Sequence, residues 1–234
     1  MEVKIYPVNS EYGGDFMKFC VREARVNIPK WYKDSKSFIG DPKTQFEKDR
    51  SMTMKKCTPI LDYLSTGLTL HLPFTIYANG KFPNREIISG IDKPDCKIGS
   101  HHPGQMQEFP LSDDYDPYPL KIDFPYTIET PPGYSALFIG STPYKDWPLI
   151  FPHAIVQVDK YKNVVNFPFL VKKDFTGKID AGVEFMKIFF IKREELDISY
   201  MSYEDGKSQI EIYANMVSAF GAGFYKKLRL DNIF

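Results

Sequence analysis

Between residues 68 and 191 the apolar positions mostly follow the period of two that is typical of β-strands. In residues 68–74 leucine or phenylalanine fills every second position, which predicts a strand with one buried face. Asn79-Gly80 then predicts a tight turn into a returning strand at 85–89. Further strand-like segments lie at 120–130, 135–139, 150–158, 164–171 and 185–191. Because no long helical pattern lies between residues 120 and 192, the chain is predicted to be mainly β, an antiparallel jelly-roll or related β-barrel.

Two other segments carry helical signals. Thr58 can cap a short helix near 58–66, Pro59 suits its first turn, and Gly67 suits a left-handed stop. A second helix is predicted near 205–220, with one apolar face that we expect to pack against the barrel. That face consists of Ile210, Tyr213, Met216, Val217 and Phe220.

The chain is expected to form a single domain of residues 1–234. Its 234 residues are long for one domain and short for two, and they contain no internal repeat or obvious linker. We divide it into an irregular N-terminal segment at 1–56, a barrel core at 57–195 and a helical tail at 196–234. Within the first segment, residues 3–8 predict a short strand, residues 28–32 an extended stretch that docks Trp31 and Tyr32, and residues 45–56 a surface connection.

Composition excludes several classes of protein. The 30 basic residues balance the 30 acidic ones, whereas a protein that neutralises phosphates normally carries a basic excess, so we expect no nucleic-acid partner. No stretch approaches about 20 apolar residues and the N-terminus lacks a signal peptide, so neither a membrane span nor secretion is expected. Cys20, Cys57 and Cys96 match no zinc or disulfide spacing, which fits a reducing compartment.

The richest polar patch is the stretch that begins at His101-His102. Together with Gln105, Gln107 and the more distant His153, it suggests a small-ligand or metal-dependent site at one mouth of the barrel. The metal candidates are His102 and His153, since adjacent histidines in a strand point to opposite faces. The alternative interpretation is a polar loop between strands, with an acidic stretch at its rim. His71 and His153 also fit structural histidines.

Motifs for covalent or nucleotide chemistry are missing from the sequence. It contains no Gly-x-Ser-x-Gly elbow and no glycine-rich phosphate loop, and Ser135 fits a turn that leads into a strand. The aromatic and proline-rich run at 143–152 predicts a connection that packs its own aromatic side chains, or alternatively a face for a partner. Catalytic residues and cofactors are therefore left unassigned, and so is enzymatic activity.

Several scattered motifs resemble an uncharacterised family found in cyanophages and some bacteria. The resemblance covers about the middle two thirds of the chain and implies a viral setting, in the host cytoplasm or the virion, without a known activity. It rests on Lys56-Cys57-Thr58-Pro59, Thr66-Gly67, Ile128-Glu129-Thr130-Pro131-Pro132-Gly133-Tyr134-Ser135, Val158-Asp159, Asn166-Phe167-Pro168-Phe169 and Lys192-Arg193-Glu194.

A fainter resemblance is to the dUTPase-like β-clip proteins. Pro132-Gly133-Tyr134 is similar to their turn before the central strand, residues 156–161 to their base- and sugar-binding hairpin, and residues 179–184 to their last glycine turn. This resemblance implies a nucleotide binder that uses Asp159 and Tyr161. The arginine of the family's phosphate motif is absent after residue 139, so hydrolysis is not implied.

The sequence thus supports three hypotheses of function. The first is a phage-type β-barrel protein with a binding or assembly role, as a homo-oligomer or with a virion or host protein as its partner. The second is a ligand-binding or metal-dependent enzyme, and the third is a dUTPase-like nucleotide binder.

Overall fold

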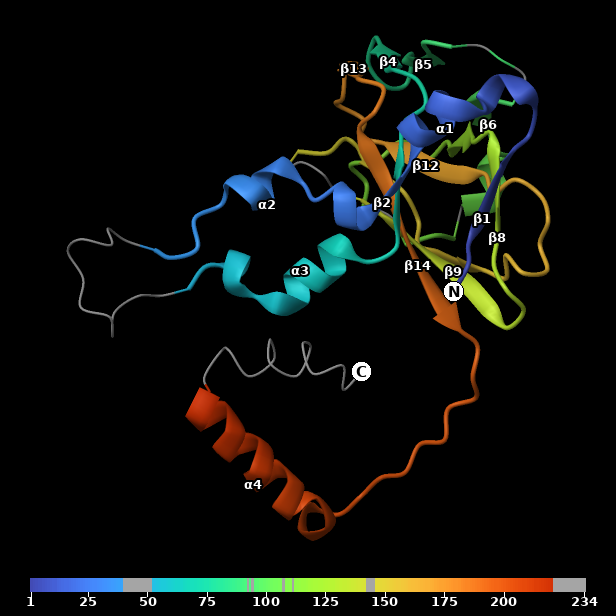
Figure 1. Cartoon of the computed structure of the whole chain (residues 1–234). Coiled ribbons are helices and arrows are strands. Elements are labelled where there is room, and N and C mark those ends of the chain that lie inside the picture. Colours follow the sequence, from blue (N-terminus) through green and yellow to red (C-terminus); the bar gives the residue numbers. More distant parts are fainter. Residues whose placement is uncertain are drawn as a thin grey trace. The chain divides into compact units, whose positions relative to one another are not determined.

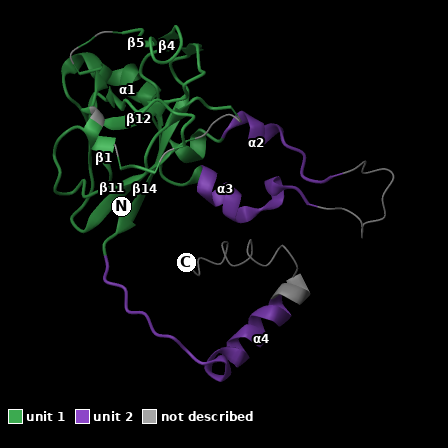
Figure 2. Cartoon of the chain, turned by 180° about the vertical axis from the view of Figure 1, so that it is seen from behind, with its two compact units in different colours: residues 1–28, 65–193 green, residues 29–64, 194–234 purple. Residues whose placement is uncertain are grey.

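The computed structural model describes residues 1–39, 52–91, 93, 95–106, 108–110, 112–141 and 146–220. Its chain divides into two compact units (Figure 2). Unit 1 comprises Met1–Ile28 and Ser65–Arg193, and unit 2 comprises Pro29–Leu64 and Glu194–Phe234. The single domain expected from the sequence stays a prediction, and each unit is described by itself.

Unit 1 is mainly β, and its strands form four antiparallel sheets (Figure 1). The sheet orders are β1-β8, β10-β12-β7-β6, β11-β9-β14-β3-β2 and β13-β4-β5. Among the described residues these sheets do not close into a barrel, so the barrel and the jelly-roll topology stay predictions. The strands are β1 Lys4–Pro7, β2 Val21–Glu23, β3 Leu68–His71, β4 Ile76–Asn79, β5 Glu86–Ser89, β6 Lys97–Ser100, β7 Leu120–Asp123, β8 Tyr126–Glu129, β9 Tyr134–Gly140, β10 Leu149–Ile150, β11 Ala154–Val156, β12 Phe167–Val171, β13 Gly177–Ile179 and β14 Glu184–Lys192.

The five-stranded sheet is organised around β14, its longest strand. β14 pairs with β9 over seven residues, from Met186 opposite Gly140 to Lys192 opposite Tyr134, and with β3 along its other edge. Its buried face contributes to an aromatic core in which the Phe185 ring lies 5.1 to 5.9 Å from three other rings. Those rings belong to Phe124, Phe151 and Phe167.

The prediction of one buried face for the strand at 68–74 is wrong. Thr69 and His71, which should face solvent, are only 1% and 3% exposed, nearly as deeply buried as Leu70 between them. The strand ends at His71, and β3 lies between β14 and β2 rather than at an edge. A strand inside a sheet can be covered on both faces, and here Asn27 covers the polar one through hydrogen bonds to both side chains.

Two long strand predictions each turn out to be two strands in different sheets. Pro125 separates β7, in the four-stranded sheet, from β8, which pairs with β1. Pro152 likewise lies between β10 and β11. Proline has no N–H to donate to a ladder, so the chain breaks its pairing there and changes sheet.

The hairpin expected at Asn79-Gly80 is present, because β4 and β5 pair from Asn79 opposite Glu86 to Ile76 opposite Ser89. Its connection spans residues 80–85 and is therefore longer than a two-residue turn. Gly80 has a φ of 78°, the left-handed conformation that favours glycine.

Unit 2 contains the helices α2 Lys30–Asp34, α4 Tyr203–Phe220 and all of α3 Thr58–Ser65 except its last residue, while α1 Gly14–Cys20 belongs to unit 1. The predictions of helices near 58–66 and 205–220 are confirmed. Residues 28–32 are not extended as predicted, since α2 begins directly after Pro29. The Tyr32 side chain is nevertheless buried and donates to the carbonyl of Lys55 at 3.0 Å, whereas Trp31 is about half exposed.

Ser202 and Asp205 explain where α4 begins. The Asp205 N–H lies 3.3 Å from Ser202 Oγ, and the Ser202 N–H donates back to the Asp205 carboxylate at 3.2 Å. This reciprocal pair is a capping box, which satisfies backbone donors at the start of the helix. Of the apolar face predicted for this helix, Ile210, Tyr213 and Met216 are exposed.

We expect Gly67→Ala to destabilise unit 1 far more than Gly133→Ala. Gly67 has a φ of 80° and Gly133 a φ of 87°. Alanine adopts this left-handed conformation at a cost of about 1–2 kcal/mol. A Cβ at residue 67 would also lie 1.9 Å from the carbonyl oxygen of Ile188, whereas one at residue 133 meets nothing within 4 Å. The loss for Gly67→Ala should therefore exceed about 3 kcal/mol.

Urea unfolding followed by Trp147 fluorescence in a Trp31→Phe background would report this difference for unit 1. Equal losses for the two alanine variants would contradict the steric argument.

Candidate functional site

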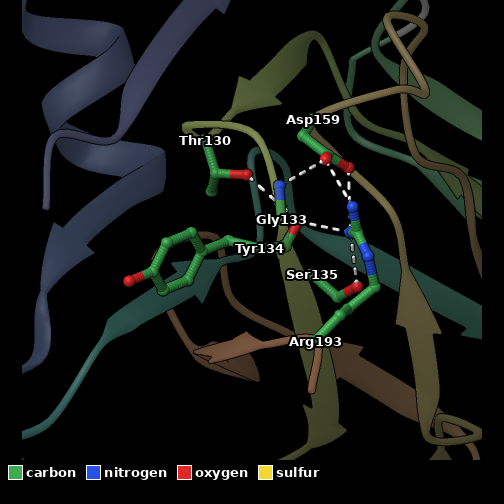
Figure 3. Close-up of polar contacts among 6 residues, drawn as sticks. All are labelled: Thr130, Gly133, Tyr134, Ser135, Asp159 and Arg193. Atoms are coloured by element: carbon green, nitrogen blue, oxygen red, sulfur yellow. Dashed lines mark hydrogen bonds and ion pairs between the residues drawn. The ribbon is translucent and has the colours of Figure 1, made fainter. Parts of the chain in front are cut away.

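A polar cluster of unit 1 joins Asp159 to Arg193 (Figure 3). Arg193 directly follows the last residue of β14, and its guanidinium forms a two-pronged ion pair with the carboxylate, at 2.9 and 2.5 Å. The same guanidinium donates to the carbonyl of Tyr134 at 2.8 Å and to Ser135 Oγ at 3.0 Å. We call this set, with Gly133, the Asp159–Arg193 clamp.

The local sequence places each member of the clamp. Gly133 follows two prolines and has a φ of 87°, so the chain turns sharply into β9. Its N–H donates to Asp159 at 2.9 Å, and its carbonyl accepts from the Arg193 N–H at 2.8 Å. Thr130 Oγ1 donates to the Tyr134 carbonyl on the other side of the turn, at 3.3 Å. The clamp therefore ties the end of β14 to the start of β9 and to the turn after Val158.

The charges of the clamp are fixed at ordinary pH. Hydrogen bonds from Arg193 hold the pKa of Asp159 well below its usual range, and the Gly133 N–H acts in the same direction. The Asp159 carboxylate also raises the pKa of Arg193. Both carboxylate oxygens are occupied and the Asp159 side chain is only 5% exposed, so it is suited to holding the fold and not to exchanging protons near neutrality.

Motifs that are far apart in the sequence meet in this clamp. The hydrogen bonds of Asp159 bring together the turn at 131–135, Val158-Asp159 and Lys192-Arg193. The sequence analysis selected Asp159 but missed Arg193 as its partner. An aspartate that becomes buried needs a cation beside it, but the sequence does not show which lysine or arginine supplies that cation.

The nucleotide hypothesis selected Asp159 and Tyr161. In the structure each of these two side chains has a hydrogen-bond partner within the chain. A sugar hydroxyl at Asp159 would have to displace the Gly133 N–H or the Arg193 guanidinium. The exposed Tyr161 hydroxyl donates to the carbonyl of Val164 at 3.4 Å. Both side chains thus have partners within the chain, and their joint role in binding a nucleotide stays a prediction.

The histidine patch is also locally satisfied. His101 Nδ1 lies 2.7 Å from Gln105 Oε1, while His102 Nδ1 accepts from the Gly104 N–H at 3.2 Å. His153 follows β10 in another part of the chain, where its Nδ1 accepts from the Gly140 N–H at 3.0 Å. Gln107 lies outside the described residues.

Within the described part of the chain, no three or more histidine, cysteine, aspartate or glutamate side chains come together in a group that could hold a metal ion. His102 and His153 thus share no such group there. The thiols of Cys20 and Cys96 are buried, and burial raises the pKa of each to about 12, so both stay protonated.

His71 is a structural histidine, as its strand context suggested. Its Nδ1 lies 2.8 Å from the carbonyl oxygen of Gly182, so Nδ1 carries the proton. Its Nε2 then accepts from the Asn27 amide at 3.1 Å. Burial lowers the pKa of His71 to about 4, which keeps the ring neutral at physiological pH.

A second buried ion pair was not anticipated from the sequence. The Arg85 side chain is 1% exposed and donates to Asp116 at 3.1 Å and to the carbonyls of Lys172 and Phe175. Asp116 belongs to the acidic stretch that we had expected at the rim of a polar loop. The alternation of apolar and polar residues in strands does not predict such a contact between two loops.

The aromatic run after Pro143 packs inward where it is described. Trp147, Leu149 and Phe151 are all buried. For these three residues the prediction that the run packs its own aromatic side chains is confirmed, and the alternative of an exposed face for a partner is not. Residues 142–145 lie outside the described part.

Comparison of the chain with protein-family models, with curated proteins and with solved structures finds no match. Across the described residues, none of the helices combines the length and apolar character that crossing a membrane requires.

We expect Asp159→Asn to lower the unfolding midpoint of the full chain at pH 7, because it leaves the Arg193 guanidinium without its counter-ion. The folded-state pKa of Asp159 is depressed, so its contribution is complete above the ordinary value of 3.8 and is lost as pH falls below it. The difference between wild type and variant should therefore shrink below about pH 4. Thermal unfolding from pH 7 to 3 measures this.

The matched control is Asp180→Asn, which removes an exposed ion pair with Lys178. It should change the midpoint little at any pH, since exposed pairs contribute little to stability. A similar loss in both variants would show that the clamp adds nothing specific.

A second pH effect should come from His71. Its folded-state pKa of about 4 lies below the ordinary 6.5, so the unfolded chain binds more protons between these values. Stability should fall as pH is lowered through this window, by about 3 kcal/mol at most. His71→Gln should flatten that slope, whereas His153→Gln, at an exposed histidine, should keep it. Identical slopes for all three proteins would refute the assignment.

Proposed function

We propose that the chain is a binding or assembly protein, in which unit 1 is the scaffold and the segment after β14 engages another protein chain. The observation that carries this proposal is the exposure of large apolar side chains in residues 196–216. Nine are exposed in that short stretch: Leu196, Ile198, Tyr200, Met201, Tyr203, Ile210, Ile212, Tyr213 and Met216. Contiguous exposed apolar side chains mark interaction sites, whereas isolated ones are ordinary.

The stretch before α4 has the character of a linear binding segment. Residues 193–202 belong to no helix or strand, and Leu196, Ile198 and Tyr200 recur with a period of two. Tyr200 is 95% exposed, and tyrosine is enriched where binding energy concentrates in interfaces. Residues 194–205 contain five acidic side chains and no basic one, which favours a partner with basic groups beside an apolar strip.

A phage setting is part of the proposal and rests on the resemblance of the clamp motifs to the cyanophage family. The finer fold assignment, a jelly-roll or β-clip-like barrel, is proposed with it. It is supported by the antiparallel pairing of every named strand and by the chain's change of sheet at Pro125 and Pro152.

Site-specific photo-cross-linking tests the proposal. We expect a photoreactive phenylalanine analogue at Tyr200 or Tyr213 to give intermolecular adducts in cells that produce the full chain, because both side chains lie in the proposed interface. The same analogue at Tyr118, an exposed tyrosine of unit 1, is the matched control and should give none. Mass spectrometry of the adducts identifies the partner, and a virion protein would support the phage setting.

Absence of adducts from both Tyr200 and Tyr213 would overturn the proposed function. Adducts that form equally well from Tyr118 would also count against it, since they would indicate non-specific contact.

A further inference from the structure

Unit 1 contains a small cavity between the start of α1, with the residues before it, and the turn that precedes β6. Its volume is about 140 Å³, and it is lined by Glu11, Tyr12, Phe16, Ile91, Lys93 and Cys96. We call it the Tyr12 cavity. Tyr12 and Cys96 are 2% and 0% exposed, whereas the side chains of Lys93 and Glu11 are 47% and 66% exposed. The two buried residues therefore form the floor of the cavity, and the charged pair forms its mouth.

Contacts between residues that are distant in sequence hold the two sides of the cavity together. Lys93 Nζ donates to Glu11 Oε2 at 3.0 Å and lies 5.7 Å from the centre of the Tyr12 ring. The Cys96 N–H donates to the Lys93 carbonyl at 3.1 Å, so one tight turn carries both a floor residue and a mouth residue. The carbonyl of Tyr12 accepts from the buried Tyr126 hydroxyl at 2.9 Å. The cavity is thus built into the fold of unit 1.

The size and lining of the cavity suit one small apolar group. The rings of Tyr12 and Phe16 lie 5.8 Å apart, and Ile91 adds an aliphatic wall. An apolar cavity of about 150 Å³ is large enough to bind benzene. The Tyr12 cavity therefore has room for a single phenyl ring or a branched aliphatic side chain, whereas a two-ring indole exceeds it.

The mouth presents both signs of charge, and both groups can accept further partners. The Lys93 ammonium has three N–H donors, of which Glu11 takes one. Glu11 Oε1 accepts no hydrogen bond from any residue that the structure describes. Glu11 also raises the pKa of Lys93, so the ammonium stays charged at neutral pH. A ligand with a carboxylate and an ammonium group on one carbon can therefore pair with both residues without breaking their own contact.

We propose that the Tyr12 cavity binds a free apolar α-amino acid of the size of leucine or phenylalanine. The side chain of the ligand fills the cavity, its carboxylate pairs with Lys93 and its ammonium group pairs with Glu11. The inference goes beyond the proposed function and is independent of it, because it concerns a site of unit 1 and not the segment after β14.

Titration of the full chain with L-phenylalanine, followed by saturation-transfer NMR, tests the site. A ligand of this size should bind with a dissociation constant on the order of 1 mM. L-Leucine should bind about as well. L-Tryptophan and L-alanine should bind at least about fivefold more weakly, because indole exceeds the cavity and a methyl group leaves most of it empty. N-acetyl-L-phenylalaninamide, which carries neither charge, should bind at least about threefold more weakly than L-phenylalanine.

Two variants at the exposed mouth separate the two charges. Lys93→Met and Glu11→Gln should each raise the dissociation constant of L-phenylalanine about threefold, because each removes one ion pair with the ligand. Lys93→Met should not weaken binding of phenethylamine, which has no carboxylate, and Glu11→Gln should not weaken binding of 3-phenylpropionate, which has no ammonium group. The matched control is Lys178→Met, which removes a lysine from an exposed ion pair with Asp180 elsewhere in unit 1 and should leave all these affinities unchanged.

Three results would overturn the site. The first is no binding of L-phenylalanine at concentrations about tenfold above the expected dissociation constant. The second is equal affinity for N-acetyl-L-phenylalaninamide, since the charged mouth would then contribute nothing. The third is an effect of Lys178→Met as large as that of Lys93→Met. None of them bears on the photo-adducts expected from Tyr200 and Tyr213, so the two proposals fail separately.

Discussion

The pairing of β14 along both of its edges is the constraint on which the rest of unit 1 depends. On one side β9 is held over seven residues, and on the other β3 is held so closely that the Ile188 carbonyl leaves no room for a side chain at residue 67. The strand's buried face supplies Phe185 to the aromatic core. The Asp159–Arg193 clamp then fixes the end of the same strand. Backbone pairing, packing and one ion pair thus act on a single segment.

An ion pair in this position first of all stabilises the fold. Asp159 is almost fully covered, and each of its oxygens accepts a hydrogen bond, so the cost of desolvating the charge is offset by close partners. Removing either partner would leave a charge without a counter-ion. The turn at 131–135, the Asp159 carboxylate and the end of β14 therefore have to come together in this fold.

Sequence periodicity predicted several of the helices and strands, but not which of them lie side by side. It located both predicted helices and the hairpin at Asn79, because capping, turn chemistry and alternation are local. It failed at His71, since burial of both faces of β3 depends on β2 and Asn27, which are distant in sequence. It also predicted a single strand across Pro125 and another across Pro152, because apolar residues continue to alternate there. Proline has no N–H to donate, so the hydrogen-bonded ladder ends at both positions.

The same limit applies to the candidate site. Asp159 and His153 were visible as residue types, but Arg193 and Gly140, their partners, depend on which strand ends lie side by side. Histidine and carboxylate counts therefore suggested a metal or ligand site at the barrel mouth that the described hydrogen bonds do not assemble. A residue type specifies what a side chain can do, and the topology decides which partner it meets.

Exposure of apolar side chains has different meanings in the two parts of the chain. Among the described residues of unit 1 most of the exposed large apolar side chains lie far apart along the chain, in strands and in loops, as in most folded proteins. In residues 196–216 nine of them lie in two groups, five within residues 196–203 and four within residues 210–216. A short helix gains most of its stability from packing of its apolar face. Under the proposed function, binding of a partner should therefore stabilise α4 as well as cover these side chains.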